Sequence, residues 1–271
     1  MQHVEVRGER IPALGFGTWQ LSGDAAHEGV RHALELGYRH IDTAQMYANE
    51  EEVGRAVRDS GVDRDEVFLT TKVPPRNLEP GVLERSHEGS LRALSMDRVD
   101  LLLIHWPSDR IPLGATLDAM RSLQEQGKTR HIGVSNFTPS LVREALRHAE
   151  VICNQVEYHP FLGQRALCEL AVEQDLMLAA YSPLAKGRVA KDATLREIGA
   201  AHDKTPAQVA LRWLVQQRNV AALPRSSSPT HRAENLDVFD FHLSDDEVKR
   251  IEELDRDQRL IDPGLAPDWE R

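Results

Sequence analysis

A repeat of short apolar runs, each followed by a stretch of helical periodicity, constrains this chain more than any other feature. Residues 99–104, VDLLLI, are a representative run in which every side chain except Asp100 is apolar. Such runs are typical of parallel strands that are covered on both faces. Eight strand–helix units follow one another from residue 14, and no Gly-, Ser- or Pro-rich linker separates them. The pattern predicts a single α/β domain over residues 1–271, a (β/α)8 TIM barrel rather than an open doubly wound sheet.

The hydrophobic period and the helix start and stop signals place the elements along the chain. Residues 3–11 alternate around Gly8, which predicts an N-terminal β-hairpin ahead of the barrel. Because ten helical stretches exceed the eight that a barrel needs, we expect extra helices. Strands are predicted over residues 14–19, 38–43, 67–73, 99–104, 131–134, 151–155, 176–181 and 220–223. Helices are predicted over residues 24–36, 50–60, 80–94, 113–126, 164–174, 193–202, 206–217, 229–236 and 244–255, with one more beginning at residue 138.

The net charge and the cysteine content limit the binding partners and the cellular compartment that we expect. The net charge of −10 argues against binding to a nucleic-acid backbone, which needs clustered Lys and Arg side chains. Cys153 and Cys168 belong to no CxxC or His/Cys cluster, so we expect two ordinary thiols in a reducing compartment. The N-terminus has no apolar signal region, and no run approaches membrane-spanning length. These features predict a cytoplasmic protein without membrane contact, and we expect a monomer.

Polar side chains stand where the predicted strands end. Asp42, Lys72 and His105 end the second, third and fourth strands, about one strand–helix unit apart, and Tyr47 lies five residues after Asp42. Because active sites of TIM barrels lie at the carboxyl ends of the strands, we expect these four residues to be neighbours.

Together the four residues suit proton delivery. A free phenol has a pKa of about 10, and a neighbouring ammonium such as that of Lys72 favours the phenolate and lowers that pKa. Asp42 can hold Lys72 charged and oriented, while His105 can hydrogen-bond either the phenol or a substrate oxygen. Tyr47 would then be a general acid/base for a developing alkoxide. This set, which includes no metal-ligand cluster, predicts carbonyl reduction or its reverse.

Other interpretations remain open. Each of the four residues alone has a plainer role, as a loop cap, a solvated lysine, a core histidine or a packing aromatic, and only their convergence favours catalysis. A metal-assisted hydrolase would need a ligand cluster that the sequence lacks. A sensor that binds a cofactor without turnover would not need all four residues.

These residues lie in stretches that resemble the aldo-keto reductase family. The matching stretches are residues 37–54 (GYRHIDTAQMYANEEEVG), 127–137 (GKTRHIGVSNF) and 223–236 (LPRSSSPTHRAENL). Within the family the chain is most similar to the bacterial 2,5-diketo-D-gluconate reductase and methylglyoxal reductase group, to which its ending at residues 264–269 (GLAPDW) also points. The resemblance implies an NAD(P)H-dependent reductase whose catalytic tetrad is Asp42, Tyr47, Lys72 and His105, with Tyr47 as the acid.

The resemblance also implies how a nicotinamide cofactor would be bound. Ser135, Asn136 and Gln155 would hydrogen-bond the carboxamide, and Tyr181 would stack on the nicotinamide ring, where a core aromatic is the alternative. The other implied cofactor contacts are Gly17, Thr18, Asp42, Ser182, Pro183, Leu184 and Gly187 near the pyrophosphate and ring, Arg225, Ser226, Ser227 and His231 near the 2′-phosphate, and Glu234 and Asn235 near the adenine. Substrate contacts would come from Trp19, Tyr47, His105 and Trp106; Phe137 could join them or pack in the core.

Two departures from the family bear on cofactor choice. Arg225 stands where the family usually has Lys, which keeps the positive charge, but His231 stands where it usually has Arg. The side chain of Arg232 lies about 100° further round the helix, so its ability to replace that Arg is open. The sequence therefore predicts a weakened preference for NADPH, with some use of NADH.

Two short segments bear on the substrate. Few residues separate His105 from the next helix, and few follow the terminal helix, whereas longer family members use both segments to enclose bulky apolar substrates. We therefore expect an open, polar site for small aldehydes, α-dicarbonyls or keto sugars. The acids Glu50–Glu52 are assigned only to favouring a helix N-terminus.

Overall fold

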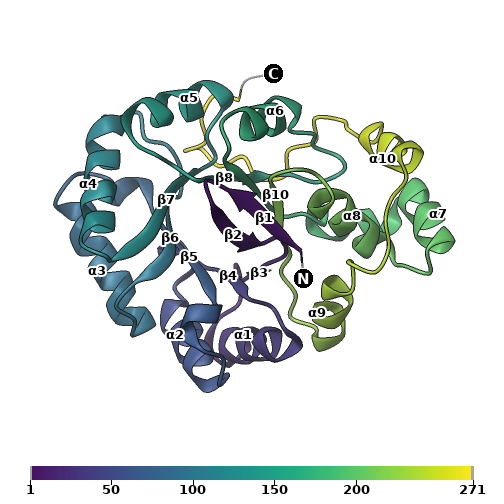
Figure 1. Cartoon of the computed structure of the whole chain (residues 1–271), viewed down its shortest axis with the longest axis horizontal. Coiled ribbons are helices and arrows are strands. Elements are labelled where there is room, and N and C mark those ends of the chain that lie inside the picture. The colour runs from purple at the N-terminus through teal and green to yellow at the C-terminus, as the bar shows by residue number, and fades with distance from the viewer. Residues whose placement is uncertain (1, 270–271) are drawn as a thin grey trace.

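The eight predicted parallel strands form a barrel in the structure, a computed structural model that describes residues 2–269. The strand order follows the chain from β3 to β10, and a parallel bridge between Leu14 and Ala222 joins the first strand to the last. The predicted fold class is confirmed (Figure 1). The strands are β3 (Phe16–Gly17), β4 (His40–Asp42), β5 (Phe68–Val73), β6 (Val99–Ile104), β7 (Thr129–Ser135), β8 (Cys153–Glu157), β9 (Met177–Tyr181) and β10 (Val220–Leu223).

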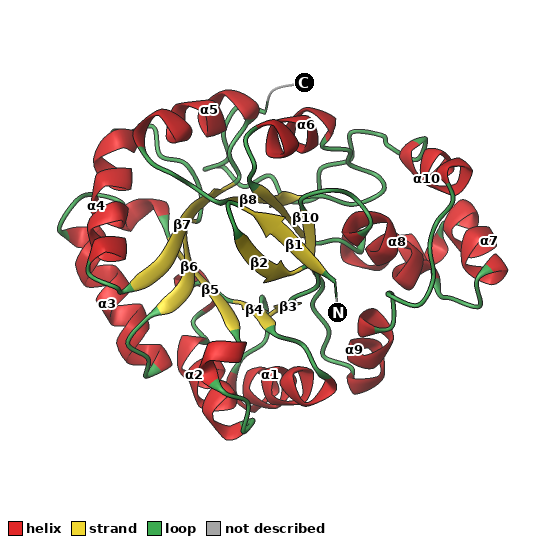
Figure 2. Ribbon diagram, viewed as in Figure 1, coloured by secondary structure: helices red, strands yellow, loops and turns green. Residues whose placement is uncertain are grey.

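Helices surround the strands, as Figure 2 shows in red around yellow. They are α1 (Gly23–Leu36), α2 (Glu50–Asp59), α3 (Val82–Leu94), α4 (Leu113–Glu125), α5 (Pro139–His148), α6 (Arg165–Glu173), α7 (Ala193–Ala201), α8 (Pro206–Val215), α9 (Pro229–Leu236) and α10 (Asp245–Glu252). None of the helices within residues 2–269 combines the length and apolar character needed to cross a bilayer.

Local sequence explains where the helices begin and end. Gly37 ends α1 with φ 106°, a left-handed conformation that costs glycine little. Helix α3 begins at Val82 rather than at the predicted residue 80, because Gly81 before it has φ 79°. Thr205 and Gln208 form a capping box that opens α8.

The predicted hairpin consists of β1 (His3–Val6) and β2 (Glu9–Pro12), and it crosses the amino end of the barrel (Figure 1). The hairpin's own apolar side chains Val4, Val6 and Ile11 are buried. His40, the first residue of β4, places its Nδ1 3.2 Å from the carbonyl oxygen of Pro12. Because the hairpin covers this end, the opposite end is the one that can hold a site.

Candidate active site

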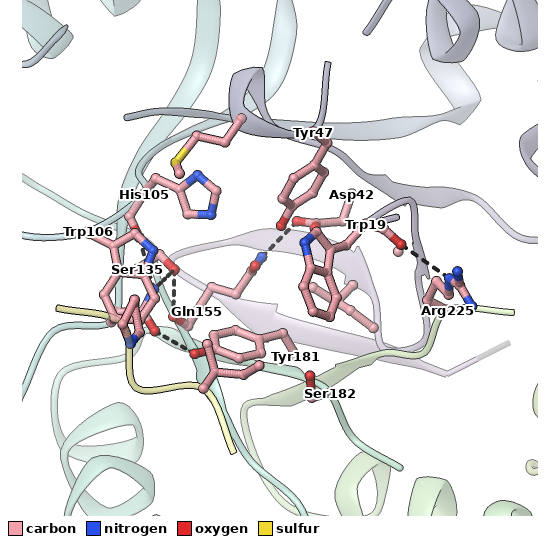
Figure 3. A pocket seen from close by; sticks show the side chains of 16 residues that line it. Trp19, Asp42, Tyr47, His105, Trp106, Ser135, Gln155, Tyr181, Ser182 and Arg225 are labelled. Atoms are coloured by element: carbon pink, nitrogen blue, oxygen red, sulfur yellow. Dashed lines mark hydrogen bonds between the residues drawn. The ribbon is translucent and has the colours of Figure 1, made fainter. Parts of the chain in front are cut away.

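A cleft of about 320 Å³ opens at the carboxyl ends of the strands (Figure 3). Seven of the eight strands or the residues directly after them contribute to its lining, as does a segment near the C-terminus. The lining residues are Gly17, Trp19, Asp42, Met46, Tyr47, His105, Trp106, Ser135, Asn136, Gln155, Tyr181, Ser182, Leu223, Arg225, Ile261 and Pro263.

Lys72 lies beneath the cleft and has no exposed surface. Its Nζ donates hydrogen bonds to Asp42 Oδ1 at 2.6 Å, the carbonyl oxygen of Thr43 at 2.9 Å and Tyr47 Oη at 3.2 Å. All three protons of the ammonium group are therefore used. Since Tyr47 Oη accepts from Lys72, its own proton is free to point elsewhere. The structure thus brings Asp42, Tyr47 and Lys72 together as predicted.

Burial sets the charges in this cluster. It raises the pKa of Tyr47, and the opposing effect of the Lys72 ammonium is smaller. The expectation that Lys72 brings the phenol pKa below its ordinary value is therefore wrong in net sign, although Lys72 acts in the expected direction. For Lys72, burial has the largest single effect and lowers the pKa, but the charges and hydrogen bonds of Asp42 and Tyr47 together outweigh it, so the net shift is upward. Near neutral pH the cluster holds an ammonium and a protonated phenol.

His105 stands beside Tyr47, with the two rings edge to face and their centroids 5.7 Å apart. Burial, aided by the charge of Lys72, lowers the pKa of His105 to about 3, so its imidazole is neutral. Its Nδ1 is buried and has no hydrogen-bond partner among residues 2–269. No hydrogen bond joins His105 to the phenol within that part of the chain.

Amide and hydroxyl groups form the side of the cleft opposite Tyr47. Gln155 donates from Nε2 to Asp42 Oδ2 at 2.7 Å, and thereby extends the acidic end of the cluster. Tyr181 Oη donates to Asn136 Oδ1 at 2.8 Å, which fixes the tyrosine ring along the cleft (Figure 3). Asn136 Nδ2 donates to Ser135 Oγ at 3.1 Å. A hydroxyl, two amides and an aromatic face suit a planar carboxamide and its ring.

A cationic region follows β10. The exposed Arg225 donates to the carbonyl oxygens of Trp19 and Gln20 at 3.1 and 3.3 Å. Ser228 caps α9, and His231 is exposed on its first turn. Arg232 is buried and turned inward, where it donates to His32 Nδ1 and the carbonyl oxygen of Ser226. Its guanidinium thus already has partners within the protein, and whether it can replace the family's Arg at a phosphate stays a prediction.

Several predicted cofactor residues are not part of the lining of this cleft. Thr18 is buried, and its hydroxyl donates to the carbonyl oxygen of Asp42 at 3.0 Å. The others follow β9 or lie before and within α9: Pro183, Leu184, Gly187, Ser226, Ser227, His231, Glu234 and Asn235. Their roles stay predictions.

The part of the cleft near Trp19 and Trp106, the predicted substrate contacts, is more apolar than expected. Trp19 and Trp106 line the cleft as predicted, but Met46, Leu223, Ile261 and Pro263 were not foreseen. The expectation of a polar site therefore applies to the floor of the cleft and not to its walls. Met46 directly precedes Tyr47 and could have been inferred, whereas nothing periodic in the tail marks Ile261 or Pro263.

Two further residues differ from the simplest expectation. Phe137 is fully buried and lines a separate small cavity beside Ile104, so it packs in the core. Glu50 does begin α2 with two further acids, as predicted, but its buried carboxylate also accepts a hydrogen bond from Thr71 at 2.6 Å.

The two cysteines are free thiols, and residues 2–269 contain no cluster placed to hold a metal ion.

A family model, sequence relatives and solved structures all match this chain. The model of the Aldo/keto reductase family matches residues 13–256. Methylglyoxal reductase DkgB of Salmonella typhimurium is 40% identical over 266 residues, which cover 96% of this chain and 99% of that protein. A 9,11-endoperoxide prostaglandin H2 reductase of Trypanosoma cruzi is 40% identical over 267 residues, covering 96% and 92%. A crystal structure of a protein assigned as 2,5-diketo-D-gluconic acid reductase B superposes with a TM-score of 0.98 at 44% identity, covering 100% and 98% of the two chains.

Proposed function

We propose, from the premise that this chain belongs to the aldo/keto reductase family, that it reduces aldehydes, α-dicarbonyls or keto sugars with NADPH and that Tyr47 donates the proton. The observation that carries this proposal is the buried ammonium of Lys72, which donates to both Asp42 and Tyr47. A nicotinamide cofactor, when bound, supplies the hydride that a carbonyl carbon accepts. Ser135, Asn136, Gln155 and Tyr181 have the chemistry to hold its carboxamide and ring.

The chain's own residues would handle the proton. A carbonyl oxygen in the cleft would lie between Tyr47 Oη and the neutral imidazole of His105. As negative charge develops on that oxygen, Tyr47 gives up its proton, and the ammonium of Lys72 stabilises the resulting phenolate. Asp42 balances the charge of Lys72, and Gln155 orients Asp42. His105 orients the substrate and is not the acid, because its low pKa keeps it unprotonated near neutrality.

For cofactor choice, we propose that Arg225, Ser226 and Ser227 bind the 2′-phosphate of NADPH. His231 would add less than an arginine because a neutral imidazole carries no charge to pair with a phosphate. The inward position of Arg232 removes the nearest substitute. The preference for NADPH should therefore be weak, with measurable NADH use.

For the substrate, the polar floor and apolar walls favour small reactive carbonyl compounds, among which methylglyoxal is suggested by the name of a 40% identical relative. We also propose that residues 1–271 act as one domain, as a monomer in the cytoplasm. The two free thiols support a reducing compartment. The mass measured by sedimentation tests the monomer.

The decisive experiment is NADPH and NADH oxidation over a panel of aldehydes, α-dicarbonyls and keto sugars, with wild type and Tyr47→Phe. We expect Tyr47→Phe to lose turnover by about 10²- to 10⁴-fold while NADPH affinity stays nearly constant. Tyr158→Phe is the matched control, because it removes a phenol that bonds Gln217 outside the cleft. Turnover by Tyr47→Phe within about tenfold of wild type would contradict the role of Tyr47 as the proton donor. Absence of turnover by wild type on every substrate of the panel would favour a sensor that binds the cofactor without catalysis.

A further inference from the structure

The segment after α10 returns to the mouth of the barrel and forms part of the candidate site. Its residues Ile261 and Pro263 line the cleft, and its Trp269 packs edge to face on Trp106 with ring centroids 6.2 Å apart. The residues from 256 to 269 contain no helix or strand, so hydrogen bonds and side-chain packing must fix their course. What fixes the backbone at Ile261 therefore fixes one wall of the cleft.

A buried carboxylate binds the N–H groups of that backbone, and Lys186 Nζ donates to the carbonyl oxygen of Leu260 at 3.2 Å. Glu157 is the last residue of β8 and has no exposed surface. The backbone N–H of Leu260 donates to both of its oxygens, at 2.9 and 3.1 Å, and the N–H of Ile261 donates to Oε2 at 2.8 Å. Burying a carboxylate is costly unless hydrogen-bond donors surround it. Glu157 is therefore fully stabilised only when the N–H groups of Leu260 and Ile261 stay in this position.

His159 supplies the remaining donor. Its Nε2 lies 2.9 Å from Glu157 Oε1, and its Nδ1 accepts the backbone N–H of Phe161 at 3.2 Å. Because Nδ1 accepts, a neutral ring carries its proton on Nε2 and donates it to Glu157. His159 is fully buried as well. The carboxylate therefore faces three N–H donors, two of which belong to the tail.

We propose that Glu157 is a positioning residue that determines substrate specificity by holding Leu260 and Ile261 against the mouth of the barrel. It does not reach the reacting atoms, and it acts through the wall that Ile261 and Pro263 form. This statement about specificity rests on the proposed function, whereas the anchoring itself does not. Nothing in the mechanism above uses Glu157 or His159.

Other contacts limit the expected damage when Glu157 changes. The backbone N–H groups of Arg256 and Gln258 donate to the carbonyl oxygen of Phe161, at 3.2 and 2.9 Å, and hold the start of the tail. Trp269 donates to Asp262 at 2.8 Å, and the guanidinium of Arg259 stacks on its ring. Loss of the carboxylate should therefore loosen the tail around residues 260–263 without detaching it.

The first test measures hydrogen exchange at single amides of the full chain. In wild type, the amides of Leu260 and Ile261 should exchange far more slowly than that of Gly264, although all three lie in an irregular segment. Glu157→Gln should speed exchange at both positions by about tenfold or more, because an amide is a weaker acceptor than a carboxylate. Rapid exchange at Leu260 and Ile261 in wild type would overturn the proposal, with no variant needed.

The second test separates KM from kcat. If Glu157→Gln leaves the tail in place only about a tenth of the time, the apparent KM for a carbonyl substrate rises about tenfold. The kcat and the NADPH affinity should stay within about threefold, because Tyr47, Lys72 and the cofactor contacts are untouched. Glu253→Gln makes the same chemical change at the exposed end of α10 and is the control. An unchanged KM with faster exchange would overturn the role in specificity.

A matched pair keeps the proposal testable if Glu157→Gln does not fold. Ile261→Ala and Ile261→Pro both replace the isoleucine side chain with a smaller apolar one, but only proline removes the N–H that donates to Glu157. Exchange at Leu260 should rise in the proline variant and not in the alanine variant, and equal exchange in the two would refute the anchor. If wild type reduces no carbonyl compound, the proposed function has failed, while the exchange data still decide whether Glu157 anchors the tail.

Discussion

Replacement of Lys72 by methionine tests the electrostatic core of the mechanism. The change keeps an unbranched side chain of similar length but removes the ammonium that lies 3.2 Å from Tyr47 Oη and 2.6 Å from Asp42 Oδ1. At 3.2 Å, with an effective dielectric constant of about 20, a unit positive charge stabilises a full phenolate charge by about 5 kcal/mol. Because about 1.4 kcal/mol corresponds to a factor of ten in rate, the full effect is about 10³- to 10⁴-fold.

The charge on Tyr47 is only partly developed in the transition state, so we expect kcat to fall by less than this full effect, about 10²- to 10³-fold. The assay is NADPH oxidation with a reactive aldehyde near pH 7, alongside a fluorescence titration of NADPH binding. Lys249→Met is the control, because it removes an exposed lysine of α10 outside the cluster. A folded Lys72→Met variant with kcat within about tenfold of wild type would refute the assigned role of the ammonium.

The same change leaves Asp42 buried without its cation. Breaking a buried pair in this way typically costs about 3 to 5 kcal/mol of stability, so urea unfolding should show a large loss for Lys72→Met. Adding Asp42→Asn removes the unpaired charge and should restore part of the stability without restoring kcat. Recovery of kcat in the double variant would show that the single variant failed through misfolding rather than lost catalysis.

The remaining predictions concern pH, cofactor choice and packing. Burial lowers the pKa of His105 to about 3, so between pH 6.5 and 3 the unfolded chain binds a proton that the folded chain does not. The free energy of unfolding should therefore fall as the pH drops below 6.5, by up to about 1.4 kcal/mol per pH unit from this group, and His105→Gln should flatten the dependence in urea titrations. His231→Arg should raise the ratio of kcat/KM for NADPH over NADH by about tenfold, because a guanidinium can pair with the 2′-phosphate, and an unchanged ratio would place the phosphate elsewhere. Gly54→Ala should lower stability by about 3 kcal/mol in chemical unfolding, because the added Cβ would lie 2.1 Å from the carbonyl oxygen of Leu94 and force α2 away from α3.

The sequence by itself determined the barrel and three residues of the cluster. Parallel strands covered on both faces leave unbroken apolar runs, and the residue that ends each run must lie at the same mouth. Asp42 ends β4 and Lys72 is the last residue but one of the adjacent strand β5, so their contact follows from order along the chain. The place of Tyr47 could be inferred because its short loop begins at Asp42.

Only the tertiary structure decided the charge state and the walls of the site. The pKa of Tyr47 depends on how deeply the phenol is buried against how near Lys72 lies, and neither quantity is a property of local sequence. The inward turn of Arg232 depends on His32 and Ser226, which lie on different elements. The tail around Ile261 has no hydrophobic periodicity from which its course could be predicted. Its backbone is instead held by the carboxylate of Glu157, more than a hundred residues earlier in the chain. Periodic backbone pairing can be predicted from the sequence, whereas contacts between side chains and irregular segments depend on the folded chain.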